Sequence, residues 1–465
     1  MVTRALPITG QINDRARTAL NLLRSQNIRP QDMLAIHPAP PTVTMGINGA
    51  APTISPAIRV APMRGANGYM DVDRDPHFEF IGCGSDGMTF SSGDMVRARY
   101  LTGGISQSAR TRPSLKCRYT GQAIEFYFRM LTTSFTYRVR VNGLYVTAAL
   151  QTFVSTIGQR NYLKVDLGSV TTAQIEVEFT DAEFGGAAIE QSGSIVRTQT
   201  ERMKMAVLSD SFGGGANGVS WNDVFCSYFS RFLNVDVFNY SIGSTGWVAP
   251  GGDGCGTYLN RLNSDVLGIN PDVLLITGPY NDVSYNPGSG VLSAATIGAA
   301  VTATLTAAMA ALPNALIIVS GVWNPSGHGS NDPGFAADAA TRSACSALGV
   351  PFFSLRNPGG LVESQAPWLT GTSYTIGNIV SVNNFAWKCS VAHTAGTFAT
   401  DLASNNWVCC AVNTGTGRVG TVTGIGNGDV WVSSDGVHPS ALGHQGIAAF
   451  MAMNIVGLTR VAAGI

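Results

Sequence analysis

A serine, a histidine and an aspartate lie at positions that suit nucleophilic catalysis. Ser211 closely follows an apolar run, and Asp435 and His438 stand three residues apart far along the chain. A serine hydroxyl becomes nucleophilic when a base accepts its proton, and the base needs an acid that orients it. Pro439 favours an extended His438 and the start of a helix, so the imidazole is expected at a loop–helix junction. The spacing predicts a triad in which Asp435 orients His438 and His438 activates Ser211.

Two other residues could donate hydrogen bonds in the same reaction. Acyl transfer places negative charge on the carbonyl oxygen, and preorganised N–H groups stabilise it. Gly243 follows the apolar segment 235–241, and Asn281 follows the apolar segment 273–278. The backbone N–H groups of Ser211 and Gly243 and the amide of Asn281 are predicted to form this oxyanion hole. Trp247 is predicted to line a small acyl pocket beside it.

The glycines after Ser211 permit a different interpretation. Gly213, Gly215 and Gly218 fit the G-x-G-x-x-G pattern of a dinucleotide-binding loop. That loop needs an acidic residue at the end of the second strand, but segment 235–241 ends in Asn-Tyr-Ser. The chain contains 54 glycines, so the pattern arises easily by chance, and the catalytic interpretation is favoured.

Each candidate also suits a purely structural role when it is taken alone. Ser211 could cap a helix, Asn281 could belong to a turn, and Asp435 could form an Asx turn. The order of the candidates at successive strand ends favours catalysis. His444, one helical turn or more past His438, is expected at the surface.

The segments around these candidates alternate between strand and helix patterns after residue 202. Such alternation, with continuously apolar strands, predicts an α/β domain with a parallel sheet covered on both faces. The predicted strands are 205–210, 235–241, 273–278, 316–321 and 350–355, and the predicted helices are 257–268, 292–311, 333–348 and 440–456. The hydrolase domain is predicted to comprise residues 201–363 and 414–465.

The rest of the chain divides into three further parts. Residues 1–62 are predicted to form an N-terminal adaptor, with a helix at 11–25 and a Pro-rich linker at 38–62. Residues 63–200 alternate apolar and polar residues and predict an antiparallel β-sandwich, with an Asn142-Gly143 turn. Predicted strands there are 124–131, 137–146, 162–169 and 174–181. Residues 364–413 have no helical period and predict an inserted β-rich module.

The composition narrows the function classes. Basic and acidic residues balance at 29 each, and only 12% of residues are charged, which argues against a nucleic-acid partner. No run of about 20 apolar residues or apolar leader is found, so neither membrane insertion nor a cleavable signal is expected. The eight cysteines form no C-x-x-C pair and are expected to be buried free thiols. No metal and no cofactor are predicted.

The candidate residues carry a family resemblance. Ser211 in an Asp-Ser turn, Gly243, the G-x-x-N at 278–281 and the D-x-x-H at 435–438 resemble the four blocks of the SGNH (GDSL-type) hydrolases. The resemblance covers about 202–362 and 414–460. It implies a flavodoxin-like three-layer sandwich and serine esterase activity. The usual Gly-Asp-Ser is Ser-Asp-Ser here, which changes the turn but removes no catalytic group.

A second resemblance concerns the substrate. The insertion resembles small chitin-binding-type carbohydrate modules, and Tyr374, Trp387 and Trp407 are predicted to stack on sugar rings. The sandwich before the hydrolase domain resembles the jelly-roll partner of carbohydrate esterases. Together the parts resemble a bacteriophage tail-fibre or tailspike protein, exposed on the virion or otherwise extracellular.

That resemblance implies a function and partners. The expected activity is removal of O-acetyl groups from a surface polysaccharide. Other tail proteins, bound through the N-terminus, and a homotrimer are further expected partners. Two alternatives remain open: a receptor-binding fibre protein with an inactive SGNH domain, and an esterase for lipids or short acyl chains.

Overall fold

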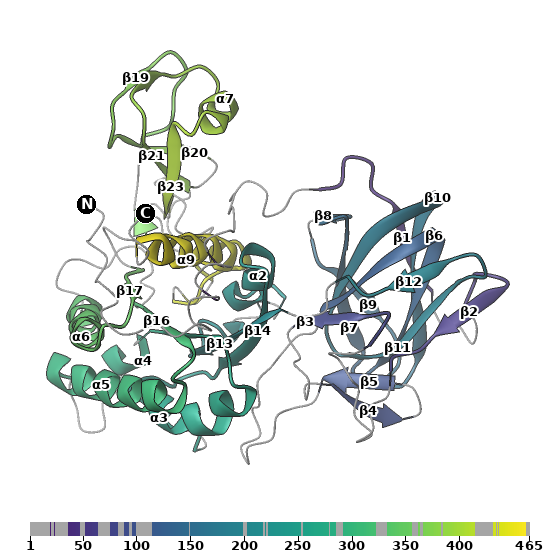
Figure 1. Ribbon diagram of the computed structural model, residues 1–465, viewed down its shortest axis with the longest axis horizontal. Coiled ribbons are helices and arrows are strands. Elements are labelled where there is room, and N and C mark those ends of the chain that lie inside the picture. Colours follow the sequence, from purple (N-terminus) through teal and green to yellow (C-terminus); the bar gives the residue numbers. More distant parts are fainter. Residues whose placement is uncertain are drawn as a thin grey trace.

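The computed structural model has three parts, an N-terminal β-domain, an α/β domain and a small module above the α/β domain (Figure 1). It describes residues 19, 23, 36–46, 52–63, 75–81, 88–92, 95–98, 114–147, 149–198, 202–216, 219, 222–252, 254–278, 280–284, 292–321, 333–355, 361–362, 366–382, 385–413, 431–433, 435 and 437–461.

The N-terminal β-domain is one twelve-stranded sheet in which all paired strands run antiparallel. The sheet encloses an apolar core, so the predicted antiparallel domain is confirmed. Its strands are β1 (Thr42–Gly46), β2 (Ala57–Val60), β3 (Glu79–Ile81), β4 (Met88–Ser92), β5 (Met95–Ala98), β6 (Ser114–Met130), β7 (Ser134–Val141), β8 (Leu144–Tyr145), β9 (Gln151–Val154), β10 (Arg160–Phe179), β11 (Ala182–Glu190) and β12 (Ser194–Val196).

Two details of this domain compare directly with the sequence prediction. Asn142 and Gly143 have φ angles of 52° and 81°, so they form the predicted tight turn, between β7 and β8. The two strands predicted at 162–169 and 174–181 are a single strand, β10. A register shift between Asp166 and Thr171 interrupts its pairing with β6, and this bulge explains the break in the alternating pattern.

The predicted linker at 38–62 is wrong as a separate unit. β1 pairs with β10 and β2 pairs with β11, so the Pro-rich segment adds two strands to the β-domain. Proline is tolerated beside edge strands, which is why its abundance did not mean a linker. Ala19 and Leu23 are buried in the core of the α/β domain. The other residues of the predicted helix at 11–25 lie outside the described residues.

The α/β domain contains a five-stranded parallel sheet with the order β14-β13-β15-β16-β17. This is the 2-1-3-4-5 order of flavodoxin-like folds, so the predicted fold class is confirmed. The sheet order places the carboxyl ends of the first three strands side by side. The strands are β13 (Met203–Ser209), β14 (Val235–Ser241), β15 (Val273–Thr277), β16 (Leu316–Ser320) and β17 (Phe352–Phe353).

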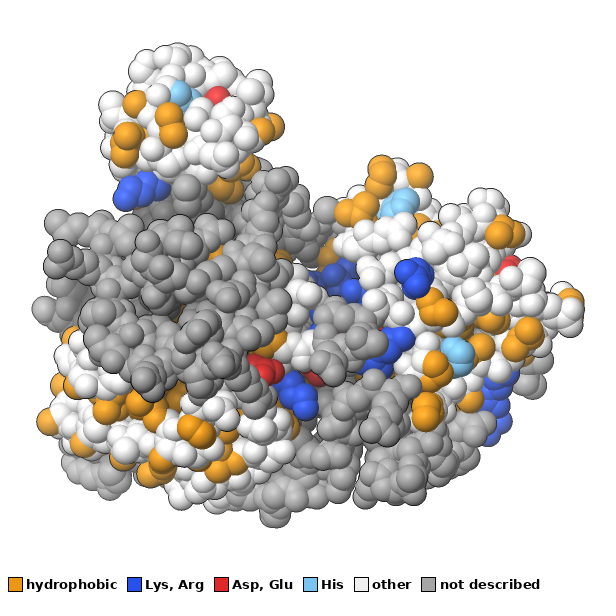
Figure 2. Space-filling view, in the orientation of Figure 1, with side chains coloured by type: hydrophobic (Ala, Val, Ile, Leu, Met, Phe, Trp, Pro, Cys, Tyr) orange, Lys and Arg blue, Asp and Glu red, His pale blue; other side chains and the backbone are white. Residues whose placement is uncertain are grey.

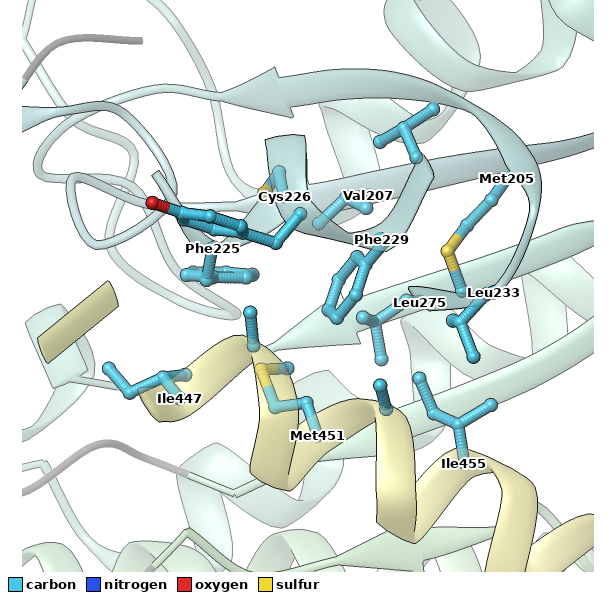
Figure 3. Close-up of a cluster of buried hydrophobic side chains, with 14 of the residues drawn as sticks. Met205, Val207, Phe225, Cys226, Phe229, Leu233, Leu275, Ile447, Met451 and Ile455 are labelled. Atoms are coloured by element: carbon cyan, nitrogen blue, oxygen red, sulfur yellow. The ribbon is translucent and has the colours of Figure 1, made fainter. Parts of the chain in front are cut away.

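Helices cover both faces of this sheet (Figure 1). Met205 and Val207 face α2 (Phe225–Phe232) and α9 (Ala441–Val461) in one core, drawn in Figure 3. Ala206 and Leu208 face the opposite core. The helices there are α3 (Tyr258–Arg261), which continues as a π-helical turn at Leu262–Val266 and a 3₁₀ turn at Leu267–Ile269, α5 (Ala294–Ala311) and α6 (Pro333–Leu348); α4 (Tyr280–Ser284) follows β15.

Among the described residues, the helix α5 is long enough and apolar enough to cross a membrane, judged by length and composition alone. The sequence analysis expected no such segment. Ile297, Val301 and Leu305 of α5 pack into the core beneath the parallel sheet, and α5 also contacts α6.

The inserted module folds around its own small core. It contains β19 (Ser373–Tyr374), β20 (Ile379–Val382), β21 (Phe385–Cys389), β22 (His393–Thr394), the short helix α7 (Phe398–Ala403) and β23 (Trp407–Asn413). β23 also pairs with β18 (Leu361–Val362), and Met453 of α9 packs against the module's core. The predicted β structure is confirmed, but α7 is an addition that Thr397 caps.

Candidate active site

Ser211, His438 and Asp435 form a continuous hydrogen-bonded chain. His438 Nε2 lies 2.7 Å from Ser211 Oγ, and His438 Nδ1 lies 2.5 Å from Asp435 Oδ2. The side chains of His438 and Asp435 are 19% and 31% exposed, so the chain of groups opens toward solvent. The fold thus brings together three residues that the sequence predicted as a triad. Their arrangement lets the imidazole accept the hydroxyl proton while the carboxylate holds the opposite ring nitrogen.

Local hydrogen bonds fix the loop that carries Asp435 and His438. Asp435 Oδ1 accepts hydrogen bonds from the backbone N–H groups of Val437 and His438, both at 3.0 Å. Ser433 N–H donates to His438 O at 2.7 Å, and Ser433 Oγ donates to Pro439 O at 2.9 Å. Asp435 therefore makes an Asx turn with one oxygen and orients the imidazole with the other, so its structural and catalytic interpretations are compatible.

Asp210 and Phe212 hold the two sides of the nucleophile. Asp210 Oδ1 accepts the Phe212 N–H at 2.9 Å, which tightens the turn around Ser211. The Phe212 ring lies against the imidazole of His438, with 5.0 Å between the ring centroids. Burial raises the pKa of Asp210 to about 7, and the nearby Asp282 adds to the rise. Neither residue carries a sequence signal that sets it apart.

The start of the loop after Ser211 depends on contacts with β14. Asn239 Nδ2 donates to Gly213 O at 2.8 Å. A Cβ atom on Gly213 would lie 2.0 Å from Ser241 Oγ, so no other residue fits this position without movement. Gly213 therefore permits close approach of the backbone to a neighbouring strand, which is a structural use of the glycines.

Two of the three predicted oxyanion donors are adjacent and available. Neither Ser211 N–H nor Gly243 N–H has a hydrogen-bond acceptor among the described residues. A Cβ atom placed on Gly243 would lie 3.7 Å from Ser211 Cβ, so the two backbones are close. Asn281 Nδ2 donates to Thr245 O at 2.9 Å and to Asp210 Oδ2 at 3.2 Å. Asn281 lies at the site, but its amide must exchange one of these acceptors before it can bind an oxyanion.

Asp282 fixes the loop that follows Gly243. Its carboxylate accepts the backbone N–H groups of Trp247, Val248 and Ala249 at 2.7 to 2.8 Å. A Cβ atom on Gly246 would lie 2.7 Å from that carboxylate, so glycine allows the approach. Burial raises the pKa of Asp282, and the three N–H groups oppose the rise. Its position directly after Asn281 is the one signal of this role in the local sequence.

Arg261 donates hydrogen bonds to the carboxyl ends of both β13 and β14. Its guanidinium is fully buried and donates to Ser209 O at 3.0 Å, to Thr245 Oγ1 at 2.8 Å and to Tyr240 O. Asp265 accepts a further bond at 3.1 Å. Nothing in the local sequence of Arg261 indicates this role, because its partners lie on three other segments.

The predicted acyl-pocket role of Trp247 is wrong. Its side chain is 2% exposed and packs edge to face on Tyr258, with ring centroids 5.2 Å apart. Both rings belong to the core beneath the sheet. Trp247 was expected to contact a ligand because it follows a strand end. Its indole instead points into the core, because Asp282 holds the Trp247 backbone.

The predicted sugar-stacking role of Tyr374, Trp387 and Trp407 is also wrong. These rings are 9%, 4% and 3% exposed and form the core of the module. Stacking on a sugar requires an exposed ring face. A module with so few aliphatic core residues needs its aromatic rings for its own stability, and this requirement decides their position.

His444 is fully buried, which corrects the expected surface position. Its Nδ1 accepts the Phe225 N–H at 3.3 Å, at the first turn of α2. Burial lowers the pKa of His444 to about 3, and the nearby His438 adds to this. His444 is therefore a neutral contact between α9 and α2, six residues from the partly exposed His438.

The described cysteines and acidic groups show no metal site. The thiols are free and buried, as predicted; Cys83 and the side chains of Cys409 and Cys410 lie outside what the structure describes. No group of three or more His, Cys, Asp or Glu side chains is placed to hold a metal ion among the described residues. The free cysteines are Cys117, Cys226, Cys255, Cys345 and Cys389.

Comparison with protein families identifies two regions. Residues 208–374 match the GDSL-like lipase/acylhydrolase family, and residues 367–406 match carbohydrate-binding module family 5/12. The first match includes Ser211, Gly243 and Asn281, and the second agrees with the predicted insertion. No curated protein matches the sequence.

Several solved structures superpose on part of the chain. A family two carbohydrate esterase from Cellvibrio japonicus is 12% identical, with a TM-score of 0.42, over 67% of this chain and 89% of that chain. An acetyl xylan esterase from Butyrivibrio proteoclasticus is 13% identical, with a TM-score of 0.38, over 67% and 89%. A salicylyl-acyltransferase from a tetracycline pathway is 11% identical, with a TM-score of 0.47, over 65% and 86%.

These TM-scores lie below 0.5, so the superpositions do not establish a common fold or function by themselves. The sheet order and the two family matches carry the assignment. The chain thus contains a GDSL/SGNH-type lipase/acylhydrolase domain that carries an inserted carbohydrate-binding module.

Proposed function

We propose that this protein is a serine esterase that removes acetyl groups from a polysaccharide. The observation that carries the proposal is the hydrogen-bonded chain from Ser211 Oγ through His438 to Asp435. The match of residues 208–374 to lipases and acylhydrolases supports the reaction class.

The chemistry follows from the geometry. Ser211 Oγ attacks the acetyl carbonyl carbon, and its proton passes to His438 Nε2. The ionised Asp435 stabilises the resulting imidazolium. The carbonyl oxygen becomes negative and accepts hydrogen bonds from the Ser211 and Gly243 N–H groups, and Asn281 joins when it releases Asp210.

Collapse of this intermediate completes the first half of the reaction. The ester C–O bond breaks, and His438 returns its proton to the departing sugar oxygen. Water then attacks the acetyl-Ser211 ester with His438 as base, acetate leaves, and Ser211 regains its proton.

The inserted module supports a carbohydrate substrate. Its residues 367–406 match a carbohydrate-binding family. Its described surface carries few charged groups, a property that suits hydrogen-bonding ligands such as sugars (Figure 2). It also packs on Met453 of α9, the helix that begins just after His438, so module and triad share one structural support.

The biological setting of the proposal is a phage tail fibre or tailspike exposed on the virion. Only the low charge and the order of domains support this part. The β-domain is built from residues that include the predicted linker, so any attachment to other tail proteins would use the β-domain surface or residues outside the described ones.

The experiment compares wild type and Ser211→Ala on p-nitrophenyl acetate and on longer acyl esters, followed by acetate release from acetylated polysaccharide. We expect turnover by the wild type, highest for acetate, and a loss of at least about 10³-fold in Ser211→Ala with unchanged thermal unfolding.

Other outcomes identify the alternatives. If the folded wild type shows no turnover, the remaining interpretation is a receptor-binding protein with an inactive hydrolase domain. A preference for long acyl chains would exclude the deacetylase and retain the triad. Turnover of the small ester without acetate release from any polysaccharide would exclude the proposed substrate class.

A further inference from the structure

A group of buried charges joins the β-domain to the hydrolase domain. Three guanidinium groups meet three carboxylates there, and the Lys116 ammonium lies near Glu176. Arg138 Nη2 lies 2.9 Å from Glu178 Oε2. Arg140 contacts both Glu176 and Glu178, and Arg231 contacts Glu178. The Tyr145 ring lies within 5.4 Å of all three guanidinium carbons. The group comprises Arg138, Arg140, Arg231, Glu176, Glu178 and Asp223.

Arg138 reaches from this group to the loop that begins at Ser211. Its Nη1 lies 3.0 Å from Asp223 Oδ1, and its Nη2 donates to Asn222 O at 3.3 Å. Asn222 and Asp223 are the last residues before Val224, the N-cap of α2. Arg138 itself is on β7 of the β-domain and is 2% exposed. One side chain of the β-domain thus binds the far end of the nucleophile loop, whose described residues are 211–216, 219 and 222–224.

Residues of the hydrolase domain also contact the described part of this loop. Tyr228 Oη, on α2, donates to Asp223 Oδ1 at 3.1 Å. The start of the loop is fixed by Asn239 on β14, through Gly213 O. Beyond its end, His444 of α9 accepts the Phe225 N–H, and Phe225 belongs to the same apolar core as Met451 of α9 (Figure 3). A shift at the end of the loop would therefore move α2 relative to α9, the helix that follows His438.

Catalysis is sensitive to such shifts. A displacement of about 1 Å in a reacting group can cost about 10²-fold in rate. The Ser211–His438 hydrogen bond of 2.7 Å connects the start of the loop to the start of α9, so both ends of the loop influence it.

We propose that Arg138 of the β-domain is a positioning residue for Ser211, so the β-domain is part of the catalytic unit. This inference rests on the proposed esterase function for its kinetic test. The effect of Arg138 on the nucleophile loop can be measured separately, without an activity assay. Arg138 acts through Asn222 and Asp223 and touches no substrate.

Arg140 offers a matched control on the same strand. It is also buried and pairs with Glu176 and Glu178 and the Tyr145 ring, all residues of the β-domain. Arg138→Met and Arg140→Met each remove one guanidinium from the same group and leave one carboxylate uncompensated, so both lower stability. Only Arg138→Met also releases the nucleophile loop.

The experiment measures p-nitrophenyl acetate hydrolysis by full-length wild type, Arg138→Met and Arg140→Met at a temperature where all three are folded. We expect kcat to fall about 10-fold or more in Arg138→Met with KM changed less than about twofold. We expect kcat within about twofold of wild type in Arg140→Met. Asp223→Asn, which removes only the charge on the hydrolase side, should lower kcat in the same direction and keeps the test usable if Arg138→Met does not fold.

Amide hydrogen exchange in peptides that cover residues 203–224 supplies a readout independent of activity. Exchange should be faster in Arg138→Met than in Arg140→Met. Equal kcat values and equal exchange in the two variants, with no effect of Asp223→Asn, would overturn the inference. If wild type shows no turnover, the proposed function fails, but the exchange comparison still decides whether Arg138 holds the loop.

Discussion

The hydrolase domain and the inserted module use their distinctive residues in opposite ways. In the hydrolase domain a five-stranded sheet and its helices supply two apolar cores, and the polar groups at the strand ends stay partly accessible. In the module, Trp387 and Trp407 are themselves the core. A small domain buries a smaller fraction of its surface and has few aliphatic residues to spare. The small size of the module therefore commits its tryptophans to stability.

Asp435→Asn would test the catalytic use of polar residues in the hydrolase domain, and it has the largest expected effect. Asparagine keeps an oxygen for the turn to Val437 and His438, but it cannot orient or stabilise a protonated imidazole. We expect kcat for p-nitrophenyl acetate to fall about 10³- to 10⁴-fold without a change in thermal unfolding. A loss of less than tenfold would show that the carboxylate serves only the loop.

Trp247→Ala and Trp407→Ala would test the structural side as a matched pair. Each removes a buried indole, and we expect each to cost about 3 to 5 kcal/mol in its own domain. Trp247→Ala should abolish ester hydrolysis by unfolding the hydrolase domain. Trp407→Ala should unfold the module alone, measured by limited proteolysis, and leave p-nitrophenyl acetate hydrolysis intact. Loss of hydrolysis in Trp407→Ala would mean that the module also supports the hydrolase core.

Acid should destabilise the junction between the β-domain and the hydrolase domain more than the module, because the two regions differ in their buried carboxylates. Burial tends to raise the pKa of Glu178, but Arg138, Arg231 and Arg140 together lower it to about 2. A lowered pKa stabilises the fold above the ordinary value of 4.5, and this stability is lost as pH falls from 4.5 toward 2.

The loss should be on the order of 2 kcal/mol at the junction between β-domain and hydrolase domain. The module, whose residues 364–413 contain Asp401 as their single acid, should change less. Proteolysis mapped by mass spectrometry across pH 5 to 2.5 would locate the first cleavage. Glu178→Gln should flatten the pH dependence of the junction; first cleavage within the module would contradict the prediction.

Met451 and Met453 test how far the two regions depend on each other. Met451 is buried in the hydrolase core, whereas Met453, two residues along α9, packs against the module's core. We expect Met453→Ala to cost about 1 kcal/mol, to weaken polysaccharide binding and to spare small-ester hydrolysis. Met451→Ala should lower the unfolding temperature of the hydrolase domain instead. Equal effects of the two variants on ester hydrolysis would mean that the module and the hydrolase domain unfold together.

Much of the active site could be predicted because it depends on strand ends. Ser211, Gly243 and Asn281 follow the first three parallel strands, and parallel strands place their carboxyl ends at one edge of a sheet. Asp435 and Pro439 lie within three residues of His438 and fix its position, so this position could also be predicted from neighbours along the chain. The supporting residues could not be predicted in this way. Arg261 and Arg138 act on segments far away in sequence, and their spacing shows no pattern.

The sequence by itself determined the strand and helix periods, the order of the catalytic blocks and the presence of a separate module. These properties depend on neighbours along the chain, which a sequence displays directly. Only the tertiary structure decided that Trp247, Tyr374, Trp387 and Trp407 are buried and that His444 is neutral and enclosed. It also decided that residues 42–46 and 57–60 are strands of the β-domain sheet. Burial depends on which surfaces meet after folding, because side-chain type sets only what a residue can do and packing sets whether solvent or a ligand can reach it.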